Sequence, residues 1–247
     1  MKTETRFQRT PDKRFICMFI YTDFKKNIKD GNFEAAKRQL KDADIDTAPF
    51  TALANSSMFL SLLFRYPDDN VYDLLRDNWD SFSDFLNEYT SEFPALYNQT
   101  DMQSDFIKLF KQDFKGSKVV PYISYYTEEN KTLYGESTFK IREWMAAEGF
   151  ALDAETSDLE DNIFIVLEFL SALFSELAQP ENIEKWYATM QNLFRLTDTY
   201  GAVITDRFAK QVQERKEMPF YAAAASLLEN FLNDIDIIIE DVLSDGE

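Results

Sequence analysis

Residues 158–178 read DLEDNIFIVLEFLSALFSELA, and this stretch decides the fold class. Its centre, Ile163 to Phe174, is interrupted by only two polar residues, Glu168 and Ser171. A helix that is apolar on all sides must be covered by other elements. The run is also shorter than the roughly 18 uninterrupted apolar residues that a membrane span requires. We therefore expect a buried helix.

The flanking sequence is also typical of helices. Apolar residues recur at spacings of three and four, and no Asn-Gly or Asp-Gly pair joins two alternating strands. The sequence predicts an all-α protein in which Asp30-Gly31, Pro67 and Gly149 end helices and Pro180 opens one. Thr100 with Gln103, and Ser137, are predicted helix N-caps. The ten predicted helices cover about 12–29, 32–42, 51–65, 69–89, 101–114, 137–148, 158–178, a segment from 180, 202–215 and 219–243.

The charges divide the chain into two parts. Its 247 residues carry 26 Lys and Arg against 44 Asp and Glu, a net charge of -18. Residues 1–50 hold 11 basic and 8 acidic side chains, and residues 51–247 hold 15 and 36. We predict a basic helical extension over 1–50 and an acidic all-helical domain over 51–247. Such a body repels nucleic acid and anionic membrane surfaces and attracts basic peptides.

The composition excludes most catalytic chemistry. There is no histidine and only one cysteine, Cys17, so His-dependent nucleophilic sites, His-ligated zinc and intramolecular disulfides are ruled out. The six glycines are all isolated, so no phosphate-binding loop is present. Acidic clusters such as 158–161 and 234–241 keep a carboxylate-only metal enzyme open as an alternative. We predict no catalytic residue, no metal and no cofactor.

The predicted helix 69–89 has an acidic face. Aromatic and leucine side chains line its other side, and adjacent acids four residues apart destabilise a helix by roughly 0.2–0.5 kcal/mol per pair. The acids either form a merely solvated surface or bind Arg and Lys side chains of a partner. This secondary acidic face consists of Asp69, Asp73, Asp77, Asp80 and Asp84.

The predicted loop over about 115–135 is long enough to suggest a function. It contains Pro121-Tyr122-Ile123-Ser124-Tyr125-Tyr126, in which a proline fixes the backbone near three tyrosines. Tyrosines offer flat contacts that are apolar on the ring and polar at the hydroxyl, which suits an extended peptide. The alternative is that these rings only fill the core between two groups of helices.

The order of motifs resembles the TorD/DmsD/NarJ family of redox-enzyme maturation chaperones. The resemblance extends over about residues 51–243. Its motifs are an acid with Leu-Phe at a helix end, a Pro-Tyr-Glu-Ser-x-Tyr loop, a glycine, and an Asp-His-Ile-x-x-Glu-Leu-x-Phe helix. The matching residues are Asp105, Leu109, Phe110, Pro121, Tyr122, Ser124, Tyr126, Gly149, Asp161, Ile163, Leu167, Glu168 and Phe169.

The resemblance implies a TorD-like bundle of roughly ten helices and a cytoplasmic, non-enzymatic role. The partner it implies is the twin-arginine signal peptide, or the apo catalytic subunit, of a molybdopterin oxidoreductase, and the chaperone would be a monomer or a domain-swapped dimer. The sequence departs from the family pattern at three positions, where Ile123 replaces Glu, Asn162 replaces His and Val166 replaces an acid. The predicted peptide-binding residues are Phe106, Leu109, Phe110, Pro121, Tyr122, Ser124, Tyr126, Asp161, Asn162 and Glu168.

Two alternatives remain at this point. The protein could be an acidic interaction or scaffold protein with no signal-peptide role. Separately, Lys13-Arg14 followed by the apolar run from Phe15 to Tyr21 resembles a basic-then-apolar signal. The N-terminal extension could therefore occupy the acidic groove of its own chain, or it could be a packing element.

Overall fold

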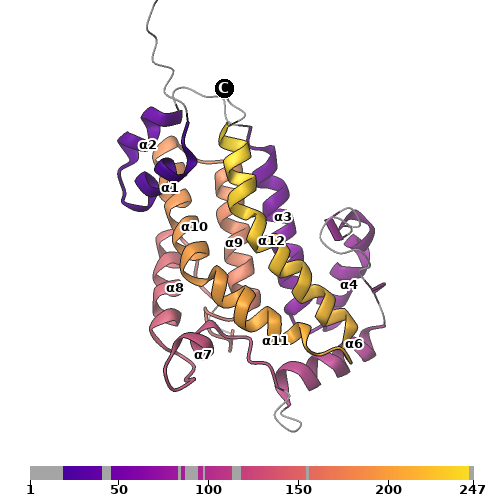
Figure 1. The fold of residues 1–247 in the computed structure, drawn as a ribbon. Helices are drawn as coiled ribbons and strands as arrows, with labels where there is room; N and C mark the ends of the chain where they lie inside the picture. Colours follow the sequence, from indigo (N-terminus) through magenta and orange to yellow (C-terminus); the bar gives the residue numbers. More distant parts are fainter. Residues whose placement is uncertain are drawn as a thin grey trace, which may run out of the picture.

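The computed structural model describes residues 19–40, 46–82, 85–86, 94–96, 98–112, 118–153 and 156–244. These residues are helical apart from connecting segments and one isolated bridge, and the all-α prediction is confirmed. Figure 1 shows the helices in a bundle. The α-helices are α1 (Tyr21–Lys29), α2 (Phe33–Leu40), α3 (Ala48–Phe64), α4 (Asp69–Asn78), α6 (Gln99–Phe106), α7 (Ile123–Thr127), α8 (Glu136–Ala147), α9 (Ile163–Ala178), α10 (Ile183–Val203), α11 (Lys210–Gln213) and α12 (Pro219–Ser244). Three short helices of other types are also present among the described residues: the 3₁₀-helix η1 (Trp79–Phe82) and the π-helices η2 (Ile107–Lys111) and η3 (Ile204–Ala209).

Helix α9 is the buried helix that the apolar stretch predicted. It packs along α3 and α10, and α12 lies against both of those helices (Figure 1). Phe174, Leu167 and Leu177 are fully buried, whereas Glu168 and Glu176 are only half-buried. One edge of α9 therefore reaches the surface. The helix begins at Ile163 instead of about 158, because the Asn162 side chain caps it by accepting a hydrogen bond from the Phe164 N–H (3.3 Å).

Several predicted helix starts are wrong. Helix α6 is capped by Asn98, which accepts a hydrogen bond from the Asp101 N–H (3.0 Å), so Thr100 lies inside the helix. Gln103 does not complete a capping box, because its amide donates to the Pro67 carbonyl (2.9 Å). Polar residues crowd each of these boundaries, and more than one can supply the capping oxygen.

The other two corrected starts concern α8 and α10. Helix α8 starts at Glu136 after Gly135, which leaves Ser137 in the first turn and not at the cap. Helix α10 starts after Asn182, which accepts a hydrogen bond from the Lys185 N–H (2.8 Å), so Pro180 precedes the helix. The predicted stops after Asp30 and before Gly149 are confirmed, with positive φ at Gly31 (71°) and Gly149 (79°).

The predicted helix 69–89 is not continuous in the described residues. Helix α4 ends at Asn78 and tightens into η1, which turns two aromatic rings toward the core. The Phe82 ring stacks on Phe59 with centroids 4.1 Å apart, and Trp79 stacks on Phe220 at 6.0 Å. The predicted loop 115–135 likewise contains a helix, α7, where the sequence indicated none.

Residues 21–40 of the N-terminal extension form a hairpin, α1–α2, seated on α10 (Figure 1), and residues 48–50 already belong to α3. Phe24 and Ile28 are fully buried, and the Lys25 ammonium lies between Asp198 (2.7 Å) and Asp236 (2.6 Å). Burial alone would raise the pKa of Asp198, but hydrogen bonds from Lys25 and Lys29 outweigh it and lower that pKa. In the described residues this hairpin packs as part of the bundle, and a domain boundary at residue 50 stays a prediction.

We expect Lys25→Ala to lower the free energy of unfolding by about 1–2 kcal/mol, because it removes the cation that Asp198 and Asp236 share and leaves Lys29 on Asp198 alone. Lys26→Ala is the matched control, since Lys26 is exposed on the same helix. The lowered pKa of Asp198 means that this contribution is present above the ordinary carboxyl pKa and is lost as the pH falls through the lowered value. Urea titrations of both variants at pH 7 and pH 3 measure it; equal stabilities at pH 7 would contradict the prediction.

Candidate functional site

The predicted motif loop is paired with the start of α9. The Ile123 N–H donates to the Asp161 carbonyl (3.0 Å), and the Ile163 N–H donates to the Pro121 carbonyl (2.9 Å). These two bonds flank an isolated antiparallel bridge between Tyr122 and Asn162. Two predicted motifs that lie about forty residues apart in sequence are thus one structural unit.

Asp161 holds this unit together. Its carboxylate is fully buried and accepts hydrogen bonds from the Ser124 N–H (2.7 Å) and the Thr138 hydroxyl (2.9 Å). One side chain therefore connects α7, α8 and the start of α9. Among the predicted peptide-binding residues, Asp161 and Ser124 face the interior, so the contacts in the structure give them a positioning role.

Asp158 gathers the polar groups of the neighbouring residues at the surface. Its Oδ1 accepts hydrogen bonds from the Tyr122 hydroxyl and from Asn162 Nδ2 (3.1 Å). Burial and the hydrogen bond to Asp158 raise the pKa of Tyr122 above its ordinary value. Asn162 thus caps α9 with its side-chain oxygen and donates a hydrogen bond to Asp158 from its NH₂ group.

Glu168, one α9 turn beyond Phe164, is paired with α3. Its Oε1 accepts from Arg65 Nη1 (2.8 Å) and from the Ser61 hydroxyl (3.3 Å). The Arg65 guanidinium carbon also lies 5.1 Å from the centroid of the Phe164 ring. Burial raises the pKa of Glu168 even though Arg65 opposes the shift. The group is a carboxylate beside an aromatic face, which is an arrangement that binds a guanidinium.

Two cavities lie on either side of this ion pair. A cavity of about 170 Å³ at the start of α9 is lined by Phe164, by two cations, Arg65 and Lys111, and by two carboxylates, Asp68 and Asp158. A larger, mainly apolar cavity of about 640 Å³ follows α9 toward its C-terminal end and includes Glu168. Its other lining residues are Met58, Met145, Phe150, Ala151, Leu152, Ile165, Phe169, Ser171, Ala172, Ser175, Glu176 and Gln179.

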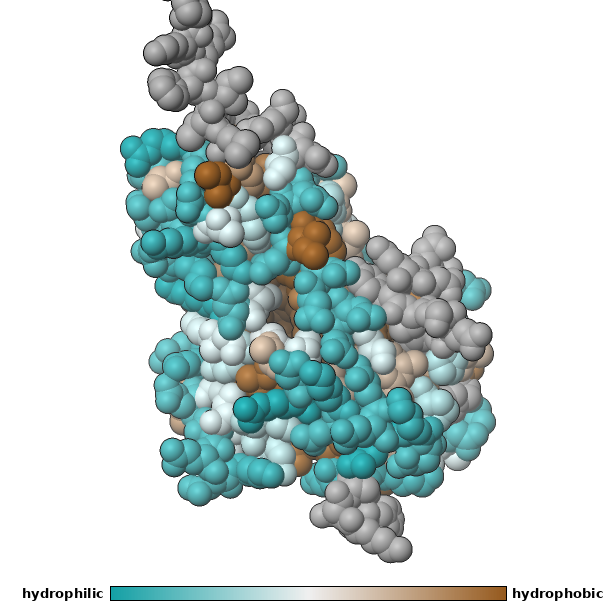
Figure 2. Space-filling model, viewed as in Figure 1, coloured by the Kyte–Doolittle hydropathy of each residue, from teal (hydrophilic) through white to brown (hydrophobic). Residues whose placement is uncertain are grey.

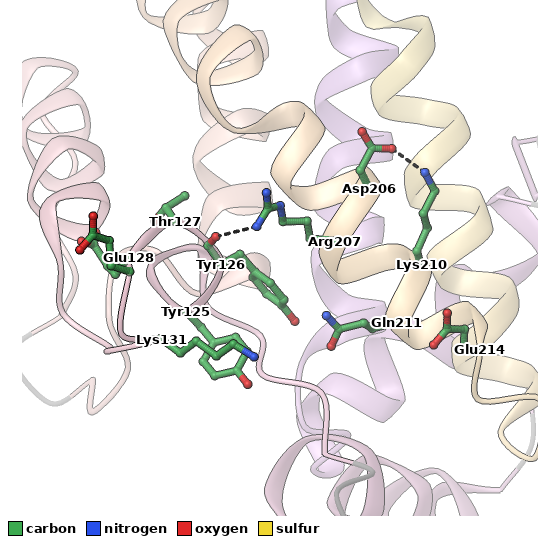
Figure 3. A pocket seen from close by; sticks show the side chains of 11 residues that line it. Tyr125, Tyr126, Thr127, Glu128, Lys131, Asp206, Arg207, Lys210, Gln211 and Glu214 are labelled. Atoms are coloured by element: carbon green, nitrogen blue, oxygen red, sulfur yellow. Dashed lines mark hydrogen bonds and ion pairs between the residues drawn. The ribbon is translucent and has the colours of Figure 1, made fainter.

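A third cavity, of about 690 Å³, lies between the motif loop and the η3–α11 segment (Figure 3). It is polar, and Figure 3 shows Arg207 reaching across to the Tyr126 carbonyl, a hydrogen bond of 3.2 Å. Lys210 pairs with Asp206 (2.7 Å) on the far wall. Burial raises the pKa of the predicted site residue Tyr126. The hydrogen bond from Arg207 links the loop to η3. Tyr126 lines this third cavity and not the two cavities along α9.

The predicted apolar contacts are buried. Phe106, Leu109 and Phe110 are at most 5% exposed. The Phe110 ring contacts Tyr221 edge to face (5.8 Å), and Phe106 alone reaches the small cavity. In this conformation these side chains stabilise the packing of α6 and η2 against α12, and their contact with a peptide stays a prediction.

The predicted acidic face is exposed but is not purely acidic. Asp73 and Asp77 both pair with Arg76 (2.7 and 2.9 Å), a cation that the sequence reasoning overlooked. Asp69 accepts from the Gln99 amide (2.9 Å). Asp80 is exposed, and Asp84 lies outside the described residues. Binding of a partner by this face stays a prediction.

The sequence reasoning also missed Arg65 and Met58, which belong to no recognisable motif. Within the described ranges, no group of three or more His, Cys, Asp or Glu side chains is placed to hold a metal ion. The same ranges hold no helix with the length and apolar character to cross a bilayer.

Comparisons with known proteins identify relatives of this chain. The model of the nitrate reductase delta subunit family matches residues 68–200, which contain the motif loop, Asp161 and Glu168. The chaperone protein TorD of Aliivibrio fischeri is 29% identical over 153 residues, 61% of this chain and 71% of that protein. The Vibrio vulnificus protein of the same name is 28% identical over 171 residues, 68% of this chain and 76% of that protein.

A solved structure described as a redox enzyme maturation protein from Archaeoglobus fulgidus has the same fold. Its TM-score is 0.50 at 22% identity, and the match covers 73% of this chain and 93% of the other. The relatives named above are chaperones, not enzymes. Since the family model matches more than half of the sequence, the chain belongs to the nitrate reductase delta subunit family, the TorD/NarJ family of chaperones for redox-enzyme maturation.

Proposed function

We propose that the protein acts in the cytoplasm and binds the N-terminal twin-arginine signal peptide, the apo form, or both, of a molybdopterin oxidoreductase subunit. The bound enzyme, its client, would be held until cofactor insertion is complete. The observation that carries the proposal is the α3–α9 surface, where a mainly apolar cavity and a smaller cavity that contains two carboxylates both border α9. A twin-arginine signal has the same order of chemistry, with basic residues followed by an apolar stretch.

The larger cavity suits the apolar stretch of a signal peptide. Its rim includes Met58 (41% exposed) and Phe150 (46% exposed), two large apolar side chains that a peptide would cover. Methionine adapts to varied apolar surfaces, and burial contributes about 25 cal/mol per Å² before ordering costs. These two residues extend the predicted contacts to side chains that a peptide can reach.

The carboxylates suit the arginines. Asp158 and Asp68 line the small cavity and Glu168 lies between the two cavities. The net charge of -18 speeds the approach of a basic peptide, and Figure 2 shows hydrophilic residues prevailing on the face it presents. Charge attraction sets the rate and the selectivity, while apolar burial provides most of the affinity.

Calorimetry with a twin-arginine signal peptide and its twin-lysine variant tests the proposal. We expect the arginine peptide to bind about tenfold more tightly, because a guanidinium makes paired hydrogen bonds and stacks on rings, whereas an ammonium does neither. A scrambled peptide of equal charge is the control for non-specific attraction. Absence of binding, or equal binding of all three peptides, would favour the acidic scaffold alternative.

A further inference from the structure

The Arg65–Glu168 pair occupies the position where a client's arginine is expected. Arg65 is the residue directly after α3, and its side chain crosses to α9 instead of following its own helix. It meets a carboxylate oxygen at 2.8 Å and an aromatic face at 5.1 Å. This is the chemistry that recognises a peptide guanidinium, already satisfied by a residue of the same chain.

The pair is exposed enough to open. The side chains of Arg65 and Glu168 are 42% and 29% exposed, and ion pairs near water contribute little to stability. Asp161 differs, because its carboxylate is fully buried and its partners belong to the packed loop and α8. Arg65 can therefore leave Glu168 without disturbing the fold, while Asp161 cannot change partners.

The position of the pair gives its opening a consequence. Arg65 and Phe164 line the small cavity, and Glu168 lines the large one. The Arg65–Glu168 ion pair thus joins a residue of one cavity lining to a residue of the other. Departure of the Arg65 side chain would expose Glu168 to both and leave one groove along α9.

On the basis of the proposed function, we propose that Arg65 is an internal stand-in for a client arginine. In the free chaperone it occupies the subsite formed by Glu168, Phe164 and Ser61, and a signal-peptide arginine replaces it on binding. Glu168 is then the carboxylate that determines specificity. A peptide must displace Arg65 to reach it, and a twin-lysine peptide does not restore the contacts that Arg65 loses. The competition lowers the affinity of every peptide that uses this subsite by the same factor, and a peptide that restores the same contacts recovers the lost free energy.

Calorimetry with the twin-arginine peptide tests this on the full chain. Arg65→Ala is expected to bind about tenfold more tightly than the wild type, because the competing group is gone. Glu168→Gln is expected to bind about tenfold more weakly. The double variant should bind no better than Glu168→Gln, since Arg65 acts only through that carboxylate, and this coupling is what a merely structural role would not produce.

Lys108→Ala is the matched control for charge. Lys108 pairs with Asp105 on the surface (3.3 Å), so its loss also removes one cation from one exposed ion pair. It should leave the affinity within about twofold of the wild type. Thermal melts of every variant confirm that each is folded.

The outcomes separate the two proposals. If the wild type binds the peptide and Arg65→Ala binds equally or more weakly, the stand-in role is wrong and the proposed function survives. The same holds if Lys108→Ala gains as much as Arg65→Ala, because charge alone then explains the gain. If neither the wild type nor any variant binds the peptide, both proposals fail.

Discussion

Asp161→Ala is expected to lower the free energy of unfolding by about 3 kcal/mol or more and to abolish ordered packing of the motif loop. The carboxylate is fully buried and accepts two hydrogen bonds, from the Ser124 N–H and the Thr138 hydroxyl. Alanine leaves both donors without their acceptor in a site with no access to water. Each buried donor left unpaired costs about 1–3 kcal/mol.

Asp161→Asn separates hydrogen bonding from charge. An asparagine oxygen can accept from the Ser124 N–H, and its NH₂ can donate to the Thr138 hydroxyl, which is able to turn and accept. We expect this variant to lose about 1 kcal/mol, a third or less of the loss in Asp161→Ala. Urea unfolding followed by circular dichroism gives both values, and hydrogen exchange of residues 118–127 reports the loop. Equal losses in the two variants would mean that the negative charge itself, not the hydrogen bonds, holds the loop.

The pairing of the loop with α9 could be predicted only in part. The sequence identified both motifs and their order, because Pro121 and the tyrosines are a rare cluster and Asp161 precedes an apolar run. It gave no sign that Asp161 accepts from Ser124 and Thr138, since long-range hydrogen bonds leave no periodic signal. Most of the residues predicted to touch a peptide are therefore buried in the structure: Phe106, Leu109, Phe110, Ser124, Asp161 and Asn162.

The acidic face and the ion pair at Glu168 also depend on side-chain contacts that the sequence pattern does not predict. The period of Asp69, Asp73 and Asp77 was evident, but Arg76 reaches both Asp73 and Asp77 because a long side chain spans one helical turn. Arg65 belongs to no local sequence pattern, and its role depends on its ion pair with Glu168 of another helix. Charge counts predicted the kind of partner, whereas only the fold determines which carboxylates already hold a cation.

The class of the fold followed from one helix. A run as apolar as Ile163 to Phe174 requires partners on nearly every side, and α3 and α10 supply them. Helix ends were less predictable, because Asn98, Asn162 and Asn182 compete with neighbouring Thr, Asp and Pro residues for the cap. The short helix α7 was missed because its five residues depend on the buried Asp161 contact more than on their own helix propensity.

Phe174→Ala measures how much of the stability depends on that central helix. The Phe174 side chain is fully buried in α9, where the helix packs against its neighbours. We expect a loss of about 3–5 kcal/mol in the free energy of unfolding, from the lost apolar transfer together with the cavity left behind. Ser175→Ala, the next residue on the same helix but exposed, should change it by no more than about 0.5 kcal/mol.

The size of the Phe174 effect also distinguishes a shared core from a separable one. If α9 organises the whole bundle, Phe174→Ala shifts the unfolding curve as one transition, and the α1–α2 hairpin on α10 unfolds with it. Hydrogen exchange of residues 21–40 measured beside residues 163–178 decides this. If the exchange rates of the hairpin are the same in Phe174→Ala as in the wild type, the hairpin opens independently of the central helix. Its own contacts, including those of Lys25, would then hold it in place.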